Sequence, residues 1–174
     1  MLQDSDNILL QRAKDLAAPL AAGNREEETI SVLAVRLAHE EYAILSSFVR
    51  EVHPLRHFSP VPCTPKFILG VVNLRSEVVS LTDLRYFFEL PWNGLTNLNK
   101  VIIVQDGTMR LGLVVDECHG FKDIPASAFH KRLPTFTDRR VDYISSVGPG
   151  PLLLLDMETI LADPRLQVRD ELVS

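Results

Sequence analysis

Two histidines four residues apart are the first candidates for chemistry, because this spacing can place two metal ligands on one face of a helix. His53 and His57 have that spacing, but Pro54 between them opposes a helix and no third ligand follows at a useful distance. We therefore expect no metal site here. The other histidines occupy polar, turn-like or basic stretches and are expected to be exposed: His39, His119 and His130.

Three aspartates, Asp83, Asp116 and Asp156, each follow an apolar strand-like run. Such carboxylates could act as acids in a cleft, and an enzyme built on Asp83 and Asp116 would need the two within several ångströms of each other, with a shifted titration in one. The alternative is that each caps the helix or turn after its strand. No serine lies in a GxSxG elbow and no glycine-rich loop precedes a helix. We therefore favour caps, and predict no catalytic residues and no cofactor.

The amino-acid composition limits the classes of partner that the protein could bind. The 174 residues are 46% hydrophobic and 24% charged, with a formal net charge of -5, which is typical of a globular chain with no basic footprint for nucleic acid. Cys63 and Cys118 are too far apart in sequence for a CxxC pair and are read as reduced thiols. No apolar run approaches the length of a membrane span or a secretory signal, so a cytosolic protein that binds proteins or small molecules is expected.

Apolar periodicity predicts a mainly β chain preceded by a helix. Leu9, Ala13, Leu16 and Leu20 share one helical face within residues 1–27, a segment that could pack on the domain, fray or dock a partner. From residue 29 onward the chain alternates like strands, with tight turns at Asp106-Gly107 and Gly148-Pro149-Gly150 and short helices after Thr82 and Asp156. Strand pairs at this density favour small barrels.

Several separated motifs occur in a family-like order: EYAI, VREV, VPCTP, GVVNLR, TDLR, GLVVDE and LLLLDMETIL. In order and spacing these resemble the CheW-like domain, the coupling module of bacterial chemosensory arrays, over about residues 28–165. The most specific segment is Gly70 to Arg75 followed by Asp83-Leu84-Arg85. Ser76 and Ser80 depart from the glycine and proline that the family usually has at these positions, which leaves the geometry of that turn and strand open.

The resemblance implies two SH3-like five-stranded β-barrel subdomains around a shared core, with short helices. It divides the chain into an N-terminal helix and linker (1–27), a CheW-like domain (28–165) and a tail (166–174), and we expect the domain to fold without the helix. It also implies a non-catalytic cytoplasmic adaptor without cofactor or metal. Its partners would be the cytoplasmic tip of chemoreceptors, which are methyl-accepting chemotaxis proteins, and the regulatory domain of a chemotaxis histidine kinase, reached at membrane arrays through protein contacts.

The GVVNLR segment and the strand after it supply the expected partner-binding residues: Val71, Val72, Asn73, Leu74, Arg75, Val78, Val79 and Leu81. The aliphatic members could equally be core. We predict an ion pair between Glu51 and Arg75, with the Arg75 head partly desolvated; the alternative is a plain surface arginine. Loop ends near Gly107 and Gly148 are candidates for contact with the kinase barrel. A small-molecule carrier remains open as another function, and would need an enclosed cavity with converging polar groups.

Overall fold

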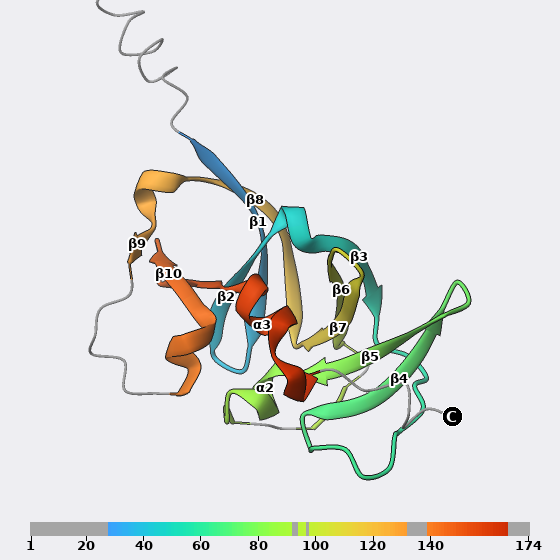
Figure 1. The fold of residues 1–174 in the computed structure, drawn as a ribbon. Coiled ribbons are helices and arrows are strands. Elements are labelled where there is room, and N and C mark those ends of the chain that lie inside the picture. The colour runs from blue at the N-terminus through green and yellow to red at the C-terminus, as the bar shows by residue number, and fades with distance from the viewer. Residues whose placement is uncertain (1–27, 92–93, 97, 132–138, 167–174) are drawn as a thin grey trace, which may run out of the picture.

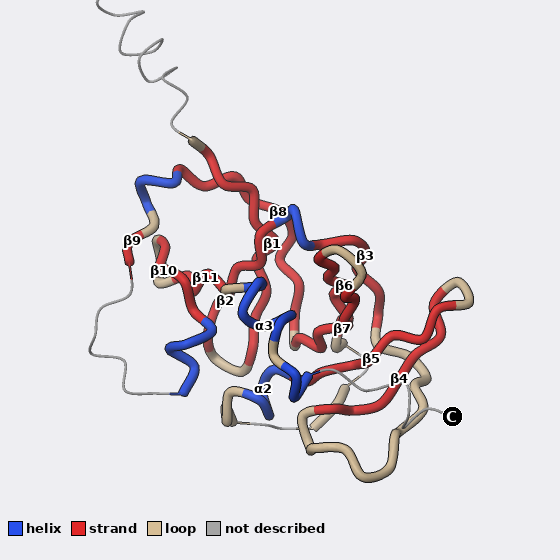
Figure 2. Tube along the Cα trace, viewed as in Figure 1, coloured by secondary structure: helices blue, strands red, loops and turns tan. Residues whose placement is uncertain are grey.

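The computed structural model describes residues 28–91, 94–96, 98–131 and 139–166, so the predicted N-terminal helix and nearly all of the predicted tail lie outside it. The strands form two sheets, as Figures 1 and 2 show. The sheet that we call barrel A contains, in spatial order, β8 (Glu117–Pro125), β1 (Thr29–Leu37), β2 (Glu40–Leu45), β11 (Leu152–Leu155), β10 (Ile144–Gly148) and β9 (His130–Lys131). Barrel B contains β3 (Val49–Pro54), β6 (Lys100–Asp106), β7 (Met109–Val115), β5 (Glu77–Asp83) and β4 (Ile68–Leu74).

The mainly β prediction with two small barrels is confirmed. Barrel B uses one continuous stretch of chain, whereas barrel A joins strands from both ends of the described residues through the parallel pair β2 and β11. Barrel A differs from the expected five strands by the two-residue strand β9, which pairs only with β10. Short helices fill the connections: η1 (Ser46–Phe48), α2 (Leu84–Phe87), η2 (Ala126–Ala128), η3 (Arg139–Tyr143), α3 (Met157–Ala162) and η4 (Pro164–Leu166).

Strand β1 shows why the two barrels share one core. Its alternate residues Leu33, Val35 and Leu37 face the central cluster, while Val32 on the opposite face lies in the smaller cluster inside barrel A. The period-two pattern of TISVLAVRL is therefore apolar on both faces. A strand buried on both sides ties barrel A to the central core.

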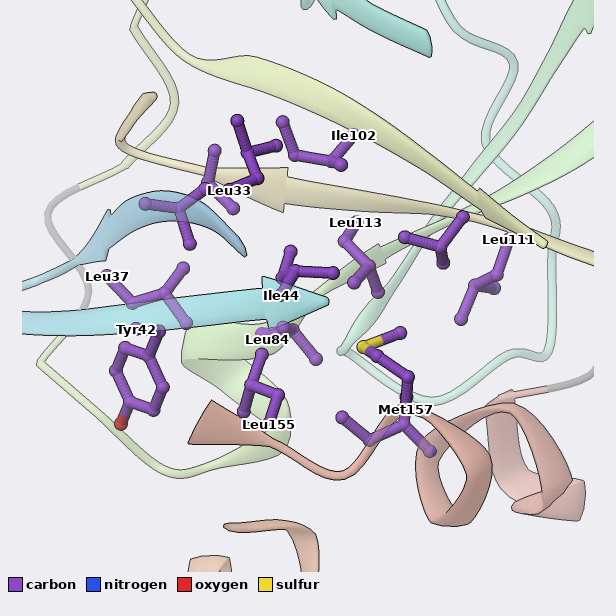
Figure 3. Packing of buried hydrophobic residues seen from close by; sticks show 14 of the residues in the cluster. Leu33, Leu37, Tyr42, Ile44, Leu84, Ile102, Leu111, Leu113, Leu155 and Met157 are labelled. Carbon is purple, nitrogen blue, oxygen red and sulfur yellow. The ribbon is translucent and has the colours of Figure 1, made fainter. Parts of the chain in front are cut away.

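The central cluster is built by both barrels and both α-helices, as Figure 3 shows. Its labelled members come from five strands and two helices: Leu33, Leu37, Tyr42, Ile44, Leu84, Ile102, Leu111, Leu113, Leu155 and Met157. Because these side chains are almost fully buried, the cluster holds the barrels together by removing apolar surface from water.

The predicted turns lie at the expected strand ends, although the two residues of the β6–β7 turn are Gly107 and Thr108, because Asp106 still pairs with Met109. Gly107 has φ 55° in that turn, and the chain from Gly148 to Gly150 leads from β10 to β11. The Asp83 carboxylate accepts the amide of Arg85 at the start of α2 (3.0 Å), and the Asp156 carboxylate accepts that of Thr159 in α3 (3.0 Å). The capping interpretation is thus confirmed for these two aspartates.

A small polar cluster fixes the end of the described chain. The Asp163 carboxylate accepts hydrogen bonds from the Tyr143 hydroxyl (2.6 Å) and from Arg165, whose guanidinium also lies 5.0 Å from the centre of the Phe87 ring. The hydrogen bonds from Arg165 lower the pKa of Asp163 to about 2; partial burial opposes the shift and the Tyr143 hydroxyl adds to it. The cluster joins α2, η3 and η4.

The Asp163 carboxylate should make the free energy of unfolding decrease at acidic pH. Because its folded-state pKa lies below the usual 3.8, its contribution is present above pH 4 and lost as the pH falls toward 2. We expect Asp163→Asn to lower the free energy of unfolding at pH 7 by about 1 to 2 kcal/mol, after allowance for the exposure of Arg165. Urea melts from pH 7 to pH 2 should show the two proteins converging in acid. A constant difference between them would contradict this assignment.

Candidate functional site

The β4–β5 hairpin projects from barrel B and carries most of the predicted partner residues (Figure 1). Leu74 pairs with Glu77 across a two-residue turn in which Arg75 has φ 51° and Ser76 has φ 69°. Two positive φ values are those of a type I′ turn, which normally takes asparagine or glycine. The serine that departs from the family pattern therefore occupies a left-handed position.

Ser76→Gly should therefore stabilise the protein by about 0.5 to 1 kcal/mol, because glycine adopts this conformation without the steric cost of a Cβ atom. Ser31→Gly in the regular strand β1 is the matched control and should destabilise by a similar amount. Chemical denaturation of the three proteins measures both effects. A loss of stability in Ser76→Gly would show that the serine makes a compensating contact.

The predicted ion pair is present in the structure, but its surroundings differ from those expected. Arg75 Nη1 lies 3.2 Å from Glu51 Oε1 on β3, a single contact rather than a pair of parallel bonds. The Arg75 side chain is 83% exposed, so the expected partial desolvation of its head is wrong: the hairpin extends beyond the barrel wall and carries the guanidinium into solvent. Glu51 is also 2.6 Å from His53 Nε2.

Charge accumulates around Glu51 in a way that keeps its carboxylate ionised. The hydrogen bond with His53 lowers the pKa of Glu51; partial burial opposes the shift and the charge of Arg75 adds to it. On the other side of the hairpin, Arg110 of β7 bonds to Glu77. The two ion pairs thus connect the hairpin tip to β3 and to β7.

The predicted partner residues separate into three groups. Asn73, Arg75 and Val78 are exposed, and Val78 at 57% is one of the most exposed aliphatic residues described. Val71, Val72 and Leu74 are half-buried.

The third group corrects the sequence interpretation. Val79 and Leu81 are each 1% exposed, because their face of β5 points into the interior of barrel B. Val79 is therefore a core residue and offers no partner surface. Leu81 is accessible only as part of the lining of a pocket.

This pocket of about 360 Å³ opens in the wall of barrel B between β3 and β4. It is lined by His53, Pro54, Leu55, Arg56, His57, Val72, Leu74, Leu81 and Val101. The two histidines considered as a metal pair thus lie in one pocket, one on a strand and one in the following loop. In the part of the chain that the structure describes, no three metal-ligating side chains come together.

Asp83 and Asp116 do meet, but with an arginine between them. Arg85 Nε and Nη2 bond to the two oxygens of Asp83 (2.9 and 2.7 Å), and Nη1 bonds to Asp116 (2.5 Å). Burial would lower the pKa of Arg85, but the hydrogen bonds and charge of Asp83, with those of Asp116, raise it. A guanidinium shared by two carboxylates is a structural ion cluster, which argues against the enzyme alternative.

The cap predicted for Asp116 is wrong: its carboxylate bonds to other segments instead of to the turn that follows its own strand. Its carboxylate accepts the amide of Ala38 in the β1–β2 turn (2.7 Å), and Asn99 Nδ2 lies 3.4 Å from it while donating to the Val115 carbonyl (3.1 Å). Asp116 stands between β7 and β8, where the chain crosses from barrel B to barrel A. The cluster therefore connects the two barrels.

The remaining histidines and cysteines agree with the sequence interpretation. His39, His119 and His130 are exposed, and both cysteines are free thiols. His119 is flanked by two carboxylates, Glu41 at 3.1 Å and Glu117 at 3.0 Å.

Four exposed large apolar residues were missed by the sequence interpretation, Val52, Leu95, Leu98 and Phe121, and two of them lie on strands. Phe121 on β8 (58% exposed) pairs with Leu33, and Val52 on β3 (39%) pairs with Ile102. Since directly paired residues share a face of the sheet, both extend the apolar surface of the central cluster to the edges of the two sheets. The signal was a phenylalanine amid polar neighbours in ECHGFKDIP, because aromatic residues are enriched in protein interfaces.

Two small barrels on one core, with a projecting hairpin and exposed apolar residues at the sheet edges, are typical of a protein-binding module. The comparisons with known proteins agree. The CheW-like domain model matches residues 31–165, so the chain belongs to the CheW-like domain family. It is a chemotaxis coupling adaptor, and proteins of this family are non-catalytic scaffolds.

Three related proteins are similar to this chain over most of their own length. The chemotaxis protein CheW of Treponema pallidum is 24% identical over 81% of this chain and 87% of its own, and that of Klebsiella aerogenes 29% over 79% and 85%. Protein PilI of Pseudomonas aeruginosa is 27% identical over 71% and 70%. The crystal structure of the scaffolding protein TtCheW from Thermoanaerobacter tengcongensis has the same fold, with a TM-score of 0.69 and 24% identity over 74% of this chain and 89% of that one.

Proposed function

We propose that this adaptor links the cytoplasmic tips of chemoreceptors to the regulatory domain of a chemotaxis histidine kinase, and so places the kinase under receptor control. The observation that carries the proposal is the family match over residues 31–165. The polar network at Arg85 supports it, because a buried arginine holds the two carboxylates most suggestive of catalysis. We infer that the protein has no hydrolase, transferase or kinase activity of its own.

Receptor tips are helical, and a surface for helices needs aliphatic contacts with a few polar groups for register. The exposed hairpin offers Asn73, Arg75 and Val78, with half-buried Val71 behind them. Phe121 and Val52 add exposed apolar area at the edges of the central cluster. We assign receptor contact to these two surfaces, and exclude Val79 because it is core.

The kinase contact is assigned to a barrel end. At Gly107 a side chain would meet no other atom within 4 Å, so this turn is open to a partner. At Gly148 a Cβ would lie 2.6 Å from the Phe129 ring, which makes the second turn part of the packing of barrel A. The turn at Gly107 is therefore the better candidate of the two.

The domain limits and location follow the family. We propose residues 28–165 as the folding unit, with residues 1–27 and 166–174 as flanking segments. Among the residues that the structure describes, no helix has the length and apolar character needed to cross a membrane. We place the protein in the cytoplasm, held at receptor arrays by protein contacts.

Phosphate incorporation in a reconstituted system tests the proposal. The protein should raise receptor-dependent autophosphorylation of its cognate kinase, and should incorporate or hydrolyse no phosphate alone. Equal incorporation with and without the protein would remove the coupling role.

Arg75 should affect binding rather than folding. Since its side chain is 83% exposed, Arg75→Ala should change the free energy of unfolding by no more than about 0.5 kcal/mol. Affinity for a receptor-tip fragment should fall by up to about five-fold, and by less than the sum of the single effects when Glu51→Ala is added. Urea denaturation measures the free energy of unfolding, and titration calorimetry measures the affinity. Lys131→Ala, exposed on β9, is the control; simple additivity, or an equal loss in the control, would assign no role to the pair.

A further inference from the structure

Barrel B has an opening in its wall that its own side chains do not fill. The strands β3 and β4 are the two edges of this sheet, and the pocket of about 360 Å³ lies between them. Its inner wall consists of Val72, Leu74, Leu81 and Val101, which belong to or pack against the apolar cluster inside the barrel. We propose that this pocket binds a small amphipathic carboxylate, with its hydrocarbon part inside the barrel and its carboxylate at the mouth.

His53, a polar residue, occupies an inward-facing position on β3 at the pocket. His53 pairs with Val101, and its side chain therefore shares the inward face of the sheet with the apolar cluster. An aliphatic residue at this position would fill the opening. With an imidazole there instead, the pocket stays open, and it has apolar walls and a polar group at its entrance. Small-molecule sites usually have this composition.

The mouth carries the guanidinium of Arg56. Arg56 and His57 line it beside His53, and neither has a hydrogen bond or an ion pair with any residue that the structure describes. No carboxylate lines the pocket, because Glu51 is directed to Arg75 and to Nε2 of His53. A group that enters the mouth thus meets the Arg56 guanidinium and the His57 imidazole, and a carboxylate would complement the guanidinium and accept hydrogen bonds.

Barrel A provides the contrast within the same molecule. A hollow of about 660 Å³ at its surface is lined by Lys122 and His119, but also by Glu41 and Asp123. His119 already contacts Glu41 there. Since that hollow supplies its own anions, the barrel B pocket is the better candidate of the two for an external one.

The pocket limits the size of its occupant. Its volume lies near the lower end of the range of about 300 to 1,000 Å³ for small-molecule sites. A short aliphatic chain or a single ring with one carboxylate satisfies both the volume and the charge. This ligand site adds to the adaptor role and does not depend on it.

Methyl NMR titration of the full chain with sodium octanoate tests the proposal, with 1-octanol and octylammonium as probes of equal chain length. Octanoate should shift the methyl signals of Val72, Leu74, Leu81 and Val101 and saturate as a single site. It should bind about ten-fold more tightly than octanol, as expected for a charge-assisted contact, and octylammonium should bind more weakly than either.

Variants separate charge from volume. Arg56→Gln combined with His57→Gln should reduce octanoate affinity to that of octanol, whereas Lys122→Gln at barrel A should leave it unchanged. Val72→Phe should fill the pocket and abolish binding of both probes while the thermal melt stays cooperative. If that variant does not fold, Leu74→Phe at a half-buried position replaces it.

Four results would overturn the proposal. These are an absence of saturable shifts, equal affinity for octanoate and octanol, and binding that survives in the filled pocket. The fourth is that a receptor-tip fragment shifts the same methyl signals while octanoate shifts none, which would assign the pocket to a partner side chain.

Discussion

Replacing Arg85 with methionine is expected to lower the free energy of unfolding by about 3 to 5 kcal/mol, because it leaves a buried carboxylate without its counter-charge. The Arg85 side chain is 2% exposed and that of Asp83 is fully buried. Methionine keeps much of the length of the side chain, so the loss reports on charge and hydrogen bonds more than on a cavity. Guanidinium chloride denaturation measures it.

A second variant and a surface control define the cause. Adding Asp83→Asn should restore part of the lost stability, because the amide oxygen still caps α2 while the buried charge is gone. Arg75→Met, which also removes an arginine from an ion pair, should cost no more than about 0.5 kcal/mol because that arginine is exposed. Similar losses at Arg75 and Arg85, or no recovery in the double variant, would contradict the role given to this cluster.

Local features of the fold were predictable because local residues determine them. The β6–β7 turn and the caps at Asp83 and Asp156 depend on backbone conformation and hydrogen bonds within a few residues. Period-two alternation located β1 correctly for the same reason.

The inward face of the hairpin could not be predicted in the same way. On β4 and β5 both faces carry aliphatic residues, and only the closure of barrel B by distant strands decides that Val79 is core while Val78 is exposed. A strand register that shifts at Gly70 adds to the ambiguity, because one residue of slippage exchanges the two faces.

The burial of charged side chains could not be predicted from the sequence. Arg75 and Glu51 were expected to meet and do so, yet the sequence contained no measure of how far the hairpin extends beyond the barrel. Arg85 was the reverse case. Its neighbour Asp83 lies two residues away, but Asp116 is 31 residues distant and the Ala38 amide comes from barrel A, so the network follows from the tertiary fold.

Gly70→Ala should be strongly destabilising, with an expected loss of about 2 to 4 kcal/mol from backbone strain and overpacking together. Gly70 has φ 153°, and a Cβ atom there would lie 2.2 Å from the Ser59 carbonyl oxygen and 2.8 Å from its carbon. The close approach exists because Ser59 and Val71 exchange two backbone hydrogen bonds of 2.8 Å, which fasten the loop after β3 to the edge of β4. The glycine of the GVVNLR motif is therefore explained by a backbone contact.

Gly150→Ala separates the two contributions to this loss. Gly150 also has a positive φ, 93°, but no atom lies within 4 Å of the position its Cβ would occupy, so it should lose only the conformational part, about 1 kcal/mol. Denaturant melts give the difference, and hydrogen exchange should show the Ser59 and Val71 amides losing protection only in Gly70→Ala. The Ser59–Val71 bridge closes one end of the gap between β3 and β4 in barrel B. Equal losses of stability in Gly70→Ala and Gly150→Ala would show that the loop at Ser59 moves away from the new Cβ atom without cost. The glycine of the motif would then have another role.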